Sequence, residues 1–416
     1  MTLNRKLIPE ERDNGNGYSF FKMLSMSFVF LYICSLYVLA YKPAYSVICD
    51  IFFLGAVACS VINFFLERNT FKLDYTFFSL LLFVGYAALT TFWVECEKEV
   101  IGLVLTLVQL FGFYIIIRLN IQSEKDFRNI IYSIYIGAVI MCLYTILFYG
   151  PGEIIRRISM GQRIGAEINQ MNGMGLYCTV LFIMTMYFII FEKKKWAYAV
   201  LPVSLFVLVG AGSRKSFLLV ALAFLLMEMF KSKKGRAIRV LAILSVICVA
   251  VYFVMELAET NKFFYRFAQV FNIFAEEEAV TDVSLNTRSY MIEYGLELFS
   301  KKPVQGYGPM QFEYFYSLLH GVRRPPHSTF IQILVGFGLI GFTLFYGMYV
   351  YVIRKLVPMI RKHRKYSIMI ITIVIMFLAN DIGGNMLNHK FIYMFFAIYA
   401  SYINMKLDDE KKVSLE

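Results

Sequence analysis

The stretch IGLVLTLVQLFGFYIII, residues 101–117, carries no charge, and only Thr106, Gln109 and Tyr114 have polar side-chain atoms. A membrane-spanning helix needs roughly 20 apolar residues, with about 17 as the lower limit. The stretch does not alternate polar and apolar residues, as a strand of a membrane β-barrel would. Because backbone groups in lipid must be satisfied within the segment, the stretch predicts a transmembrane α-helix.

Eleven further runs of this kind follow the same rule. With the first, they cover approximately 20–41, 45–66, 75–94, 98–117, 129–149, 171–191, 196–212, 215–230, 240–257, 328–353, 366–384 and 390–405. The chain of 416 residues is 59% hydrophobic and 17% charged, whereas soluble domains are nearer half apolar and a quarter charged. We therefore expect an all-α polytopic membrane protein with about 12 transmembrane helices.

The distribution of Lys and Arg predicts the orientation. With the N-terminus in the cytoplasm, the inside segments hold 26 of the 41 Lys and Arg residues, and the short outside segments hold 8. The remaining 7 lie in one long outside segment, where the positive-inside rule weakens. Both termini are expected inside, with the protein in the bacterial cytoplasmic (inner) membrane.

Neither the net charge of +12 nor the seven cysteines indicate a specific binding function. A basic balance can indicate nucleic-acid binding, but here the charges follow the bilayer, so we expect membrane lipids and no nucleic acid as partners. The cysteines contain no CxxC pair, which argues against a disulfide framework and a thiolate metal site.

Residues 258–326 form a 69-residue outside segment, far longer than ordinary helix connections, and such loops are usually functional. The chain thus divides into transmembrane helices 1–9 (1–257), a large extracytoplasmic loop (258–326), and helices 10–12 with a cytoplasmic tail (327–416). Phenylalanines spaced along 263–274 predict a helix on the outer membrane surface, or one packed on its own loop. A second short helix is expected from Thr287 to about Ser300, capped by Asn286 or Thr287.

Polar residues gather at the predicted outer ends of the helices, which indicates a polar cavity that opens outward. Arginine suits phosphate because its planar fork makes bidentate, permanently charged hydrogen bonds. Arg163, Arg214 and Arg288 are the favoured ligands of an anion. For four other outer arginines we prefer snorkelling or contact with lipid headgroups; these are Arg156, Arg157, Arg323 and Arg324.

Further candidates lie beside these arginines. The expected substrate-binding residues are Arg163, Asn169, Asn172, Lys215, Gly306, Tyr307 and Gly308. His327 follows two prolines and precedes a predicted helix; its imidazole can accept a proton from a sugar hydroxyl, or it can cap the helix.

Glycines and carboxylates lead to two exclusions. Gly336–Gly341 matches GxGxxG but lacks a strand before it, so dinucleotide binding is rejected and close approach of transmembrane helices is preferred. The run Glu276–Glu278 with Asp282 reads as a solvated loop face. No DxD-like pair occurs on the outer side, so we expect neither a catalytic metal nor a cofactor.

The order of these motifs resembles the O-antigen ligase and polysaccharide polymerase superfamily of bacterial membrane glycosyltransferases. The resemblance rests on Arg163-Ile-Gly with Asn169 and Asn172, on Ser213-Arg214, on NTRSYMIEYGLELFSKKPVQGYG (286–308) and on HSTFIQILVGFGLIG (327–341). Ile292 and Ser328 stand where members of the superfamily commonly carry an aromatic residue and Asn.

The resemblance implies a GT-C-like enzyme that acts at the extracytoplasmic face and transfers glycan from a polyprenyl-pyrophosphate carrier without a metal. By the same resemblance, Arg214 and Arg288 hold the donor pyrophosphate, Arg163 assists, and His327 activates or orients the acceptor. A lipid-linked oligosaccharide is then the substrate, with a chain-length regulator and a flippase as possible partners.

Three functions remain open. The first is a polymerase that joins lipid-linked repeat units into capsule, exopolysaccharide or O-antigen. The second is a ligase that moves a finished glycan to a lipid or protein acceptor. The third is a non-enzymatic transporter of lipid-linked sugars, which would place its charges near the midplane and often shows internal repeats. Charge at the outer rim and no visible repeat favour an enzyme.

Overall fold

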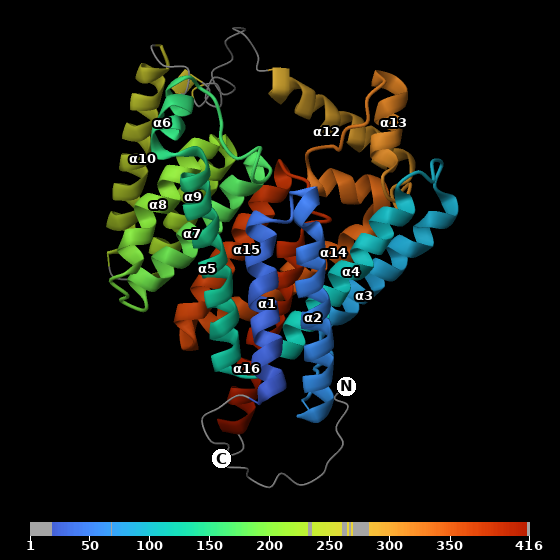
Figure 1. The fold of residues 1–416 in the computed structure, drawn as a ribbon. Coiled ribbons are helices and arrows are strands. Elements are labelled where there is room, and N and C mark those ends of the chain that lie inside the picture. The colour runs from blue at the N-terminus through green and yellow to red at the C-terminus, as the bar shows by residue number, and fades with distance from the viewer. Residues whose placement is uncertain are drawn as a thin grey trace.

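The computed structural model describes residues 19–67, 69–231, 235–259, 264–265, 268 and 283–413, and every regular element in these ranges is helical. Figure 1 shows the helices side by side, with α6, α12 and α13 at the end away from the last turns of α16. The α-helices are α1 (Phe20–Val38), α2 (Ser46–Leu66), α3 (Tyr75–Leu89), α4 (Val100–Asn120), α5 (Glu124–Tyr149), α6 (Pro151–Ser159), α7 (Met171–Ile190), α8 (Ala197–Ala211), α9 (Arg214–Lys231), α10 (Arg236–Ala258), α12 (Val283–Lys301), α13 (Gln311–His320), α14 (Thr329–Lys362), α15 (Arg364–Ile382) and α16 (Lys390–Val413).

Each of the twelve predicted apolar runs forms a helix. Within the described ranges, nine helices are long and apolar enough to cross a membrane. The three others that correspond to predicted runs are α8, α9 and α16, which coincide with the three shortest runs. The expected class, an all-α polytopic membrane protein, is confirmed.

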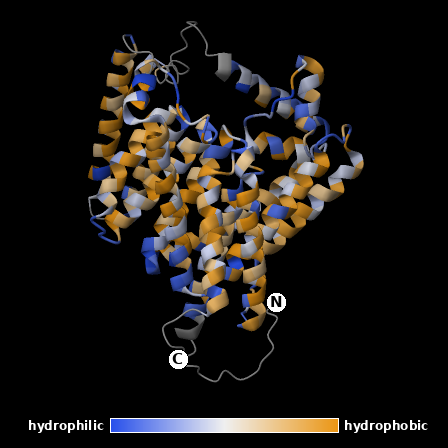
Figure 2. Cartoon of the chain, viewed as in Figure 1, coloured by the Kyte–Doolittle hydropathy of each residue, from blue (hydrophilic) through white to orange (hydrophobic). Residues whose placement is uncertain are grey.

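The outer surface of the helices is apolar, as a surface in contact with lipid must be. Helix α10 buries none of its 23 residues, although it is among the most apolar segments. Large side chains such as Leu147 and Phe92 are more than 80% exposed. Figure 2 shows hydrophobic residues along the middle of the helices and hydrophilic residues toward their ends. Apolar exposure on this scale marks a membrane-embedded surface.

The segments predicted to share the cytoplasmic side meet at one end of the bundle. Lys22 in α1 lies 3.2 Å from the carboxylate of Asp126 at the start of α5, and both side chains are buried. Lys406, near the end of α16, lies 2.7 Å from Glu124. These contacts join the start of α1, the start of α5 and the last part of α16, which are far apart in the sequence. The structure therefore places these three predicted cytoplasmic segments at the same end of the bundle.

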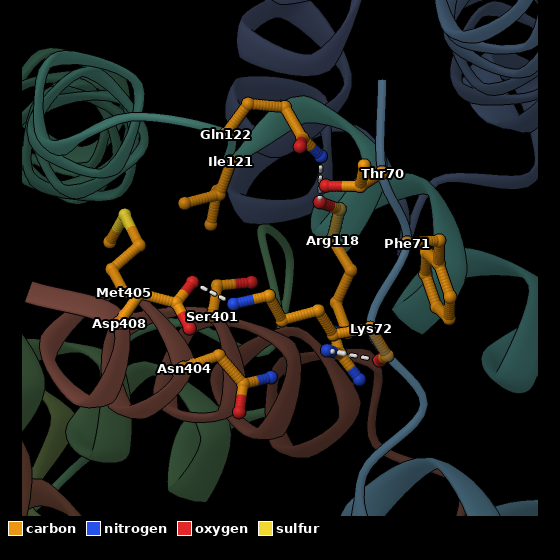
Figure 3. A pocket seen from close by; sticks show the side chains of 10 residues that line it. All are labelled: Thr70, Phe71, Lys72, Arg118, Ile121, Gln122, Ser401, Asn404, Met405 and Asp408. Carbon is orange, nitrogen blue, oxygen red and sulfur yellow. Dashed lines mark hydrogen bonds and ion pairs between the residues drawn. The ribbon is translucent and has the colours of Figure 1, made fainter. Parts of the chain in front are cut away.

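A small cavity of about 90 Å³ at this end shows how its charges are balanced (Figure 3). Arg118 in α4 lies 2.9 Å from Asp74, and its guanidinium also donates to the carbonyl of Lys72. The Lys72 ammonium pairs in turn with Asp408 of α16. Each cation that lines this cavity has a carboxylate partner, so the cluster reads as a structural clamp on the helix ends.

The opposite end carries the connections around α12 and α13. The predicted second loop helix is present as α12, but it begins at Val283, so Asn286 and Thr287 lie inside it and the predicted cap is wrong. Helix α13 was not predicted; the side chain of Gln311 docks it by accepting from the backbone N–H of Glu95 and of Cys96, at 3.1 and 3.2 Å. The predicted surface helix over 263–274 lies almost wholly outside the described residues.

Helix α14 is interrupted at Gly338, whose φ of 59° and ψ of −162° are non-helical. The segment that follows α12 docks into the break: the Leu339 N–H donates to the Pro303 carbonyl at 2.9 Å, and the Gly308 N–H donates to the Gly336 carbonyl at 2.7 Å. The expectation that Gly336 and Gly338 allow transmembrane helices to approach is therefore wrong. Their close neighbours are the backbone of the docked segment, which a side chain would displace.

We predict that Gly338→Ala destabilises the protein. A Cβ at this position would lie 2.2 Å from the Val304 carbonyl oxygen, in a backbone conformation that L-residues rarely adopt. Such strain costs about 1–3 kcal/mol before the clash is counted. Thermal unfolding in detergent should show a lower Tm for Gly338→Ala. The control is Gly112→Ala within α4, where nothing lies within 4 Å of the added Cβ; equal Tm values for the two variants would contradict the assignment.

Candidate active site

The motif around Arg163 and the Ser213-Arg214 motif meet at the start of α9. Arg163, in the connection between α6 and α7, donates from Nε to the Ala211 carbonyl at 2.7 Å and from Nη2 to Asn172 Oδ1 at 2.8 Å. Ala211 ends α8, and Arg214 is the first residue of α9. The Arg163 motif and the Ser213-Arg214 motif therefore form one local structure.

Lys215 connects the start of α9 to the end of α15. Its ammonium donates to the Gly383 carbonyl at 3.1 Å and lies 3.5 Å from the Asn380 carbonyl. Carbonyls at a helix C-terminus lack intrahelical partners and carry partial negative charge, so a cation is favourable there. This contact places Arg214, the preceding residue, at the junction of α8, α9 and α15.

A buried carboxylate fixes the start of α14 beside the same junction. Asp381, fully buried near the end of α15, accepts from Thr329 Oγ1 at 3.1 Å and from the Tyr346 hydroxyl at 3.2 Å. Thr329 Oγ1 also lies 2.7 Å from the Gly384 carbonyl. Because Thr329 is the first residue of α14, these bonds hold the residues just before that helix, His327 among them, next to the end of α15.

Helix α12 is packed closely against α14 by a small second core. This core contains Met291, Leu298, Tyr307, Phe312, Tyr316, Ile331 and Val335. Gly295 makes the approach possible, since a Cβ there would lie 2.2 Å from Ile331 Cγ2. Arg288 lies about two helical turns before Gly295. The packing therefore carries Arg288 toward the start of α14.

His327 lies where these elements meet. Its backbone is left-handed, with φ of 54°, and Ser328 occupies the N-cap position of α14. The alternative interpretation of His327 as the helix cap is therefore wrong. Burial lowers the pKa of His327, and the charges of Arg288, Arg324 and Lys215 lower the pKa further. Three cations from separate segments thus lie close enough to His327 to disfavour its imidazolium form.

The other predicted substrate-binding residues lie in more structural surroundings. Asn169 is buried; its amide donates to the Tyr37 carbonyl, and its Oδ1 accepts from the Gln170 N–H. The Gly306 carbonyl accepts from the Trp93 indole at 3.2 Å, and Tyr307 packs in the second core. Gly308 pairs with the broken α14, as described above. Their binding roles remain predictions, while Arg163, Lys215, Arg288 and His327 gather around the start of α9.

Two residues at this site were not expected from the sequence. Arg324 was interpreted as a headgroup contact, but its charge acts on His327. Asp381 was not singled out and fell only under the general expectation of polar residues at the outer helix ends. For Arg324 the usable signal was its place three residues before His327, with only Pro325 and Pro326 between them. For Asp381 the signal was an acidic residue inside the apolar run 366–384. Within the described ranges, no group of three or more His, Cys, Asp or Glu side chains is placed to hold a metal ion.

We predict that Arg288→Gln raises the pKa of His327, because it removes the positive charge that disfavours the imidazolium most strongly. In the unmodified protein the pKa should lie below the usual value of ~6.5. The pKa can be followed by NMR titration of labelled histidine, with the His327 signal assigned from its loss in His327→Gln. Arg323→Gln is the matched control, since Arg323 lies beside Glu99 and Cys96 instead; equal shifts in both variants would contradict the arrangement.

Comparison with known proteins follows the same segments. Residues 197–346 match the family model described as O-antigen ligase, a match that covers little more than a third of the chain. It runs from the start of α8 through α9 and α12 into α14, and so includes Arg214, Arg288 and His327. No curated protein matches the chain. This membrane protein is therefore similar to the O-antigen ligase family over residues 197–346, the segment that holds these three predicted site residues.

Proposed function

We propose that the protein polymerises polyprenyl-pyrophosphate-linked oligosaccharide repeat units into a surface polysaccharide, at the extracytoplasmic face and without a metal. One observation carries the proposal: Lys215 at the start of α9, Arg288 in α12 and Arg324 before α14 all lower the pKa of His327, and Arg163 bonds the end of α8 next to the start of α9. The family match supports glycosyl transfer of the O-antigen ligase type.

In this proposal the donor diphosphate binds at the start of α9. Arg214 and Arg288 supply guanidinium forks, and Arg163 and Lys215 add positive charge from either side of the helix start. The dipole of α9, which is positive at the start of the helix, also favours a phosphate there. Fixed positive charge stabilises the diphosphate as it leaves, and this term commonly dominates such catalysis.

His327 acts on the acceptor. The acceptor hydroxyl oxygen attacks the anomeric carbon of the donor sugar, its proton passes to the imidazole, and the glycosidic bond to the diphosphate breaks. The electron pair of that bond remains on the polyprenyl diphosphate, and the imidazolium later releases its proton to water. A base must be neutral to accept a proton, so burial and the surrounding cations adapt His327 to this role.

The excess of Lys and Arg at the opposite end of the bundle supports an outward-facing site with both termini in the cytoplasm. That orientation suits a lipid-linked repeat unit that a flippase has delivered to the outer leaflet. A chain-length regulator would act on the same growing polymer. These partners, and the GT-C-like character of the fold, belong to the proposal.

Transfer to a different acceptor is the second candidate, because the matching family is described as O-antigen ligase. A ligase would use the same diphosphate and histidine chemistry but would transfer a finished glycan once. Incubation of the purified protein with one defined lipid-linked repeat unit separates the possibilities. A ladder of products indicates a polymerase, whereas transfer only to an added lipid or protein acceptor indicates a ligase. Movement of the lipid without a new glycosidic bond indicates a transporter.

We predict that Arg288→Lys lowers polymer formation in this assay by about 10²–10³-fold, because a point charge does not reproduce the bidentate fork. Donor binding should weaken in this variant. His327→Ala should also stop transfer but leave donor binding intact, which separates the two roles. Arg323→Lys is the control, since Arg323 contacts Cys96 and Glu99. Polymer of normal length and yield from Arg288→Lys would refute the diphosphate role.

We predict that a cysteine at position 320 reacts with an impermeant thiol reagent in intact cells. His320 is exposed on α13, at the same end as the proposed site. Cys34, Cys96 and Cys248, which are not buried, are first replaced by alanine. The control variant Arg361→Cys changes an exposed residue at the other end of the bundle, and its thiol should react only after lysis. The reverse pattern would overturn the orientation.

A further inference from the structure

A second and larger cavity lies at the end opposite His327. It has a volume of about 830 Å³ and lies between the start of α5, the end of α7, the end of α9, the α14–α15 connection and the last part of α16. Seven Lys or Arg residues line it, against two glutamates. None of these residues belongs to the proposed transferase site.

The charges around this cavity are only partly balanced, whereas each cation that lines the smaller cavity of Figure 3 has a carboxylate partner. Four of the seven cations have carboxylate partners: Lys406 pairs with Glu124 and Asp409, Lys365 lies 3.8 Å from Glu192, Lys231 lies 3.1 Å from Glu228, and Lys362 lies 3.0 Å from Glu410. Arg128 and Lys193, by contrast, make no ion pair with any residue in the part of the chain that the structure describes. Like charges gathered without counter-charges destabilise one another, and a bound anion relieves that repulsion.

The cavity also has an apolar lining. Ile190, Phe191, Tyr366 and Tyr402 contribute to its wall, and the rings of Tyr366 and Tyr402 lie 6.1 Å apart. Helix α9, on one side, packs between α15 and helix α10, which has no buried residue, so the cavity lies close to the surrounding lipid. A cationic rim beside aromatic rings at the ends of transmembrane helices suits a ligand with an anionic head and apolar chains.

We propose that this cavity binds the phosphate-bearing headgroup of an anionic phospholipid, with Arg128 and Lys193 as the cations that select it. The volume accommodates a headgroup with two phosphates, and basic pockets between helices are the sites at which such lipids bind specifically. A soluble phosphate compound offers the same charge without the chains. The lipid is favoured because aromatic side chains and lipid-facing helices border the cavity.

The test uses the full-length protein in detergent and native mass spectrometry with three probes: tetraoleoyl cardiolipin, phosphatidylethanolamine of the same chains, and inorganic pyrophosphate. We expect cardiolipin to bind at least tenfold more tightly than phosphatidylethanolamine. The double variant Arg128→Gln/Lys193→Gln should lose at least tenfold in cardiolipin affinity. The control Lys355→Gln/Arg361→Gln removes two exposed cations from the same end that do not line the cavity, and it should change the affinity less than twofold.

The remaining outcomes would overturn the proposal. Equal binding of the two lipids would remove headgroup selection, and an equal loss in both double variants would reduce the effect to general surface charge. Complete displacement of cardiolipin by pyrophosphate at equal concentration would assign the cavity to a soluble phosphate compound. Both double variants are first compared with the unmodified protein by thermal unfolding without added lipid. The single variant Lys193→Gln changes only one exposed residue. If the double variant unfolds at a lower temperature, the loss of cardiolipin affinity is measured in this milder variant instead.

Discussion

Hydrogen bonds to one buried carboxylate, Asp381, hold together the helix ends on which the proposed site depends. Thr329 and Tyr346 bond its two oxygens, and Lys215 bonds the carbonyls on either side of it in the chain. A buried carboxylate left without such partners costs more than the about 1–3 kcal/mol of a neutral group, so the arrangement resists rearrangement. Arg214 directly precedes Lys215, and His327 lies two residues before Thr329. The hydrogen bonds around Asp381 therefore position both residues.

The helices and the two ends of the bundle could be predicted because the signals that specify them are local. The length of each apolar run predicts a spanning helix, and the Lys and Arg residues near the helix ends predict which connections lie on the same side of the membrane. Arg163, Arg288 and His327 could be singled out for a related reason: a guanidinium or imidazole on the side that normally lacks positive charge stands out within a short window of sequence. The structure brings these three to one region, around the start of α9.

What could not be predicted depends on contacts between distant segments. The break at Gly338 exists because residues 303–308 supply backbone partners to it, and no window around Gly338 contains that information. Helix α13 is docked by Gln311 on the connection before α4, some 200 residues away along the chain. Arg324 was misread because its charge matters only once α14 has brought His327 beside Arg288.

The most direct test of the account is an electron cryo-microscopy structure of the protein with a bound polyprenyl pyrophosphate. The central claim is that guanidinium groups from separate parts of the chain surround one diphosphate. We expect the diphosphate at the start of α9, within hydrogen-bond distance of Arg214 and Arg288, with the His327 imidazole facing the adjacent space for an acceptor. A diphosphate bound elsewhere, or one touched by neither arginine, would contradict the account.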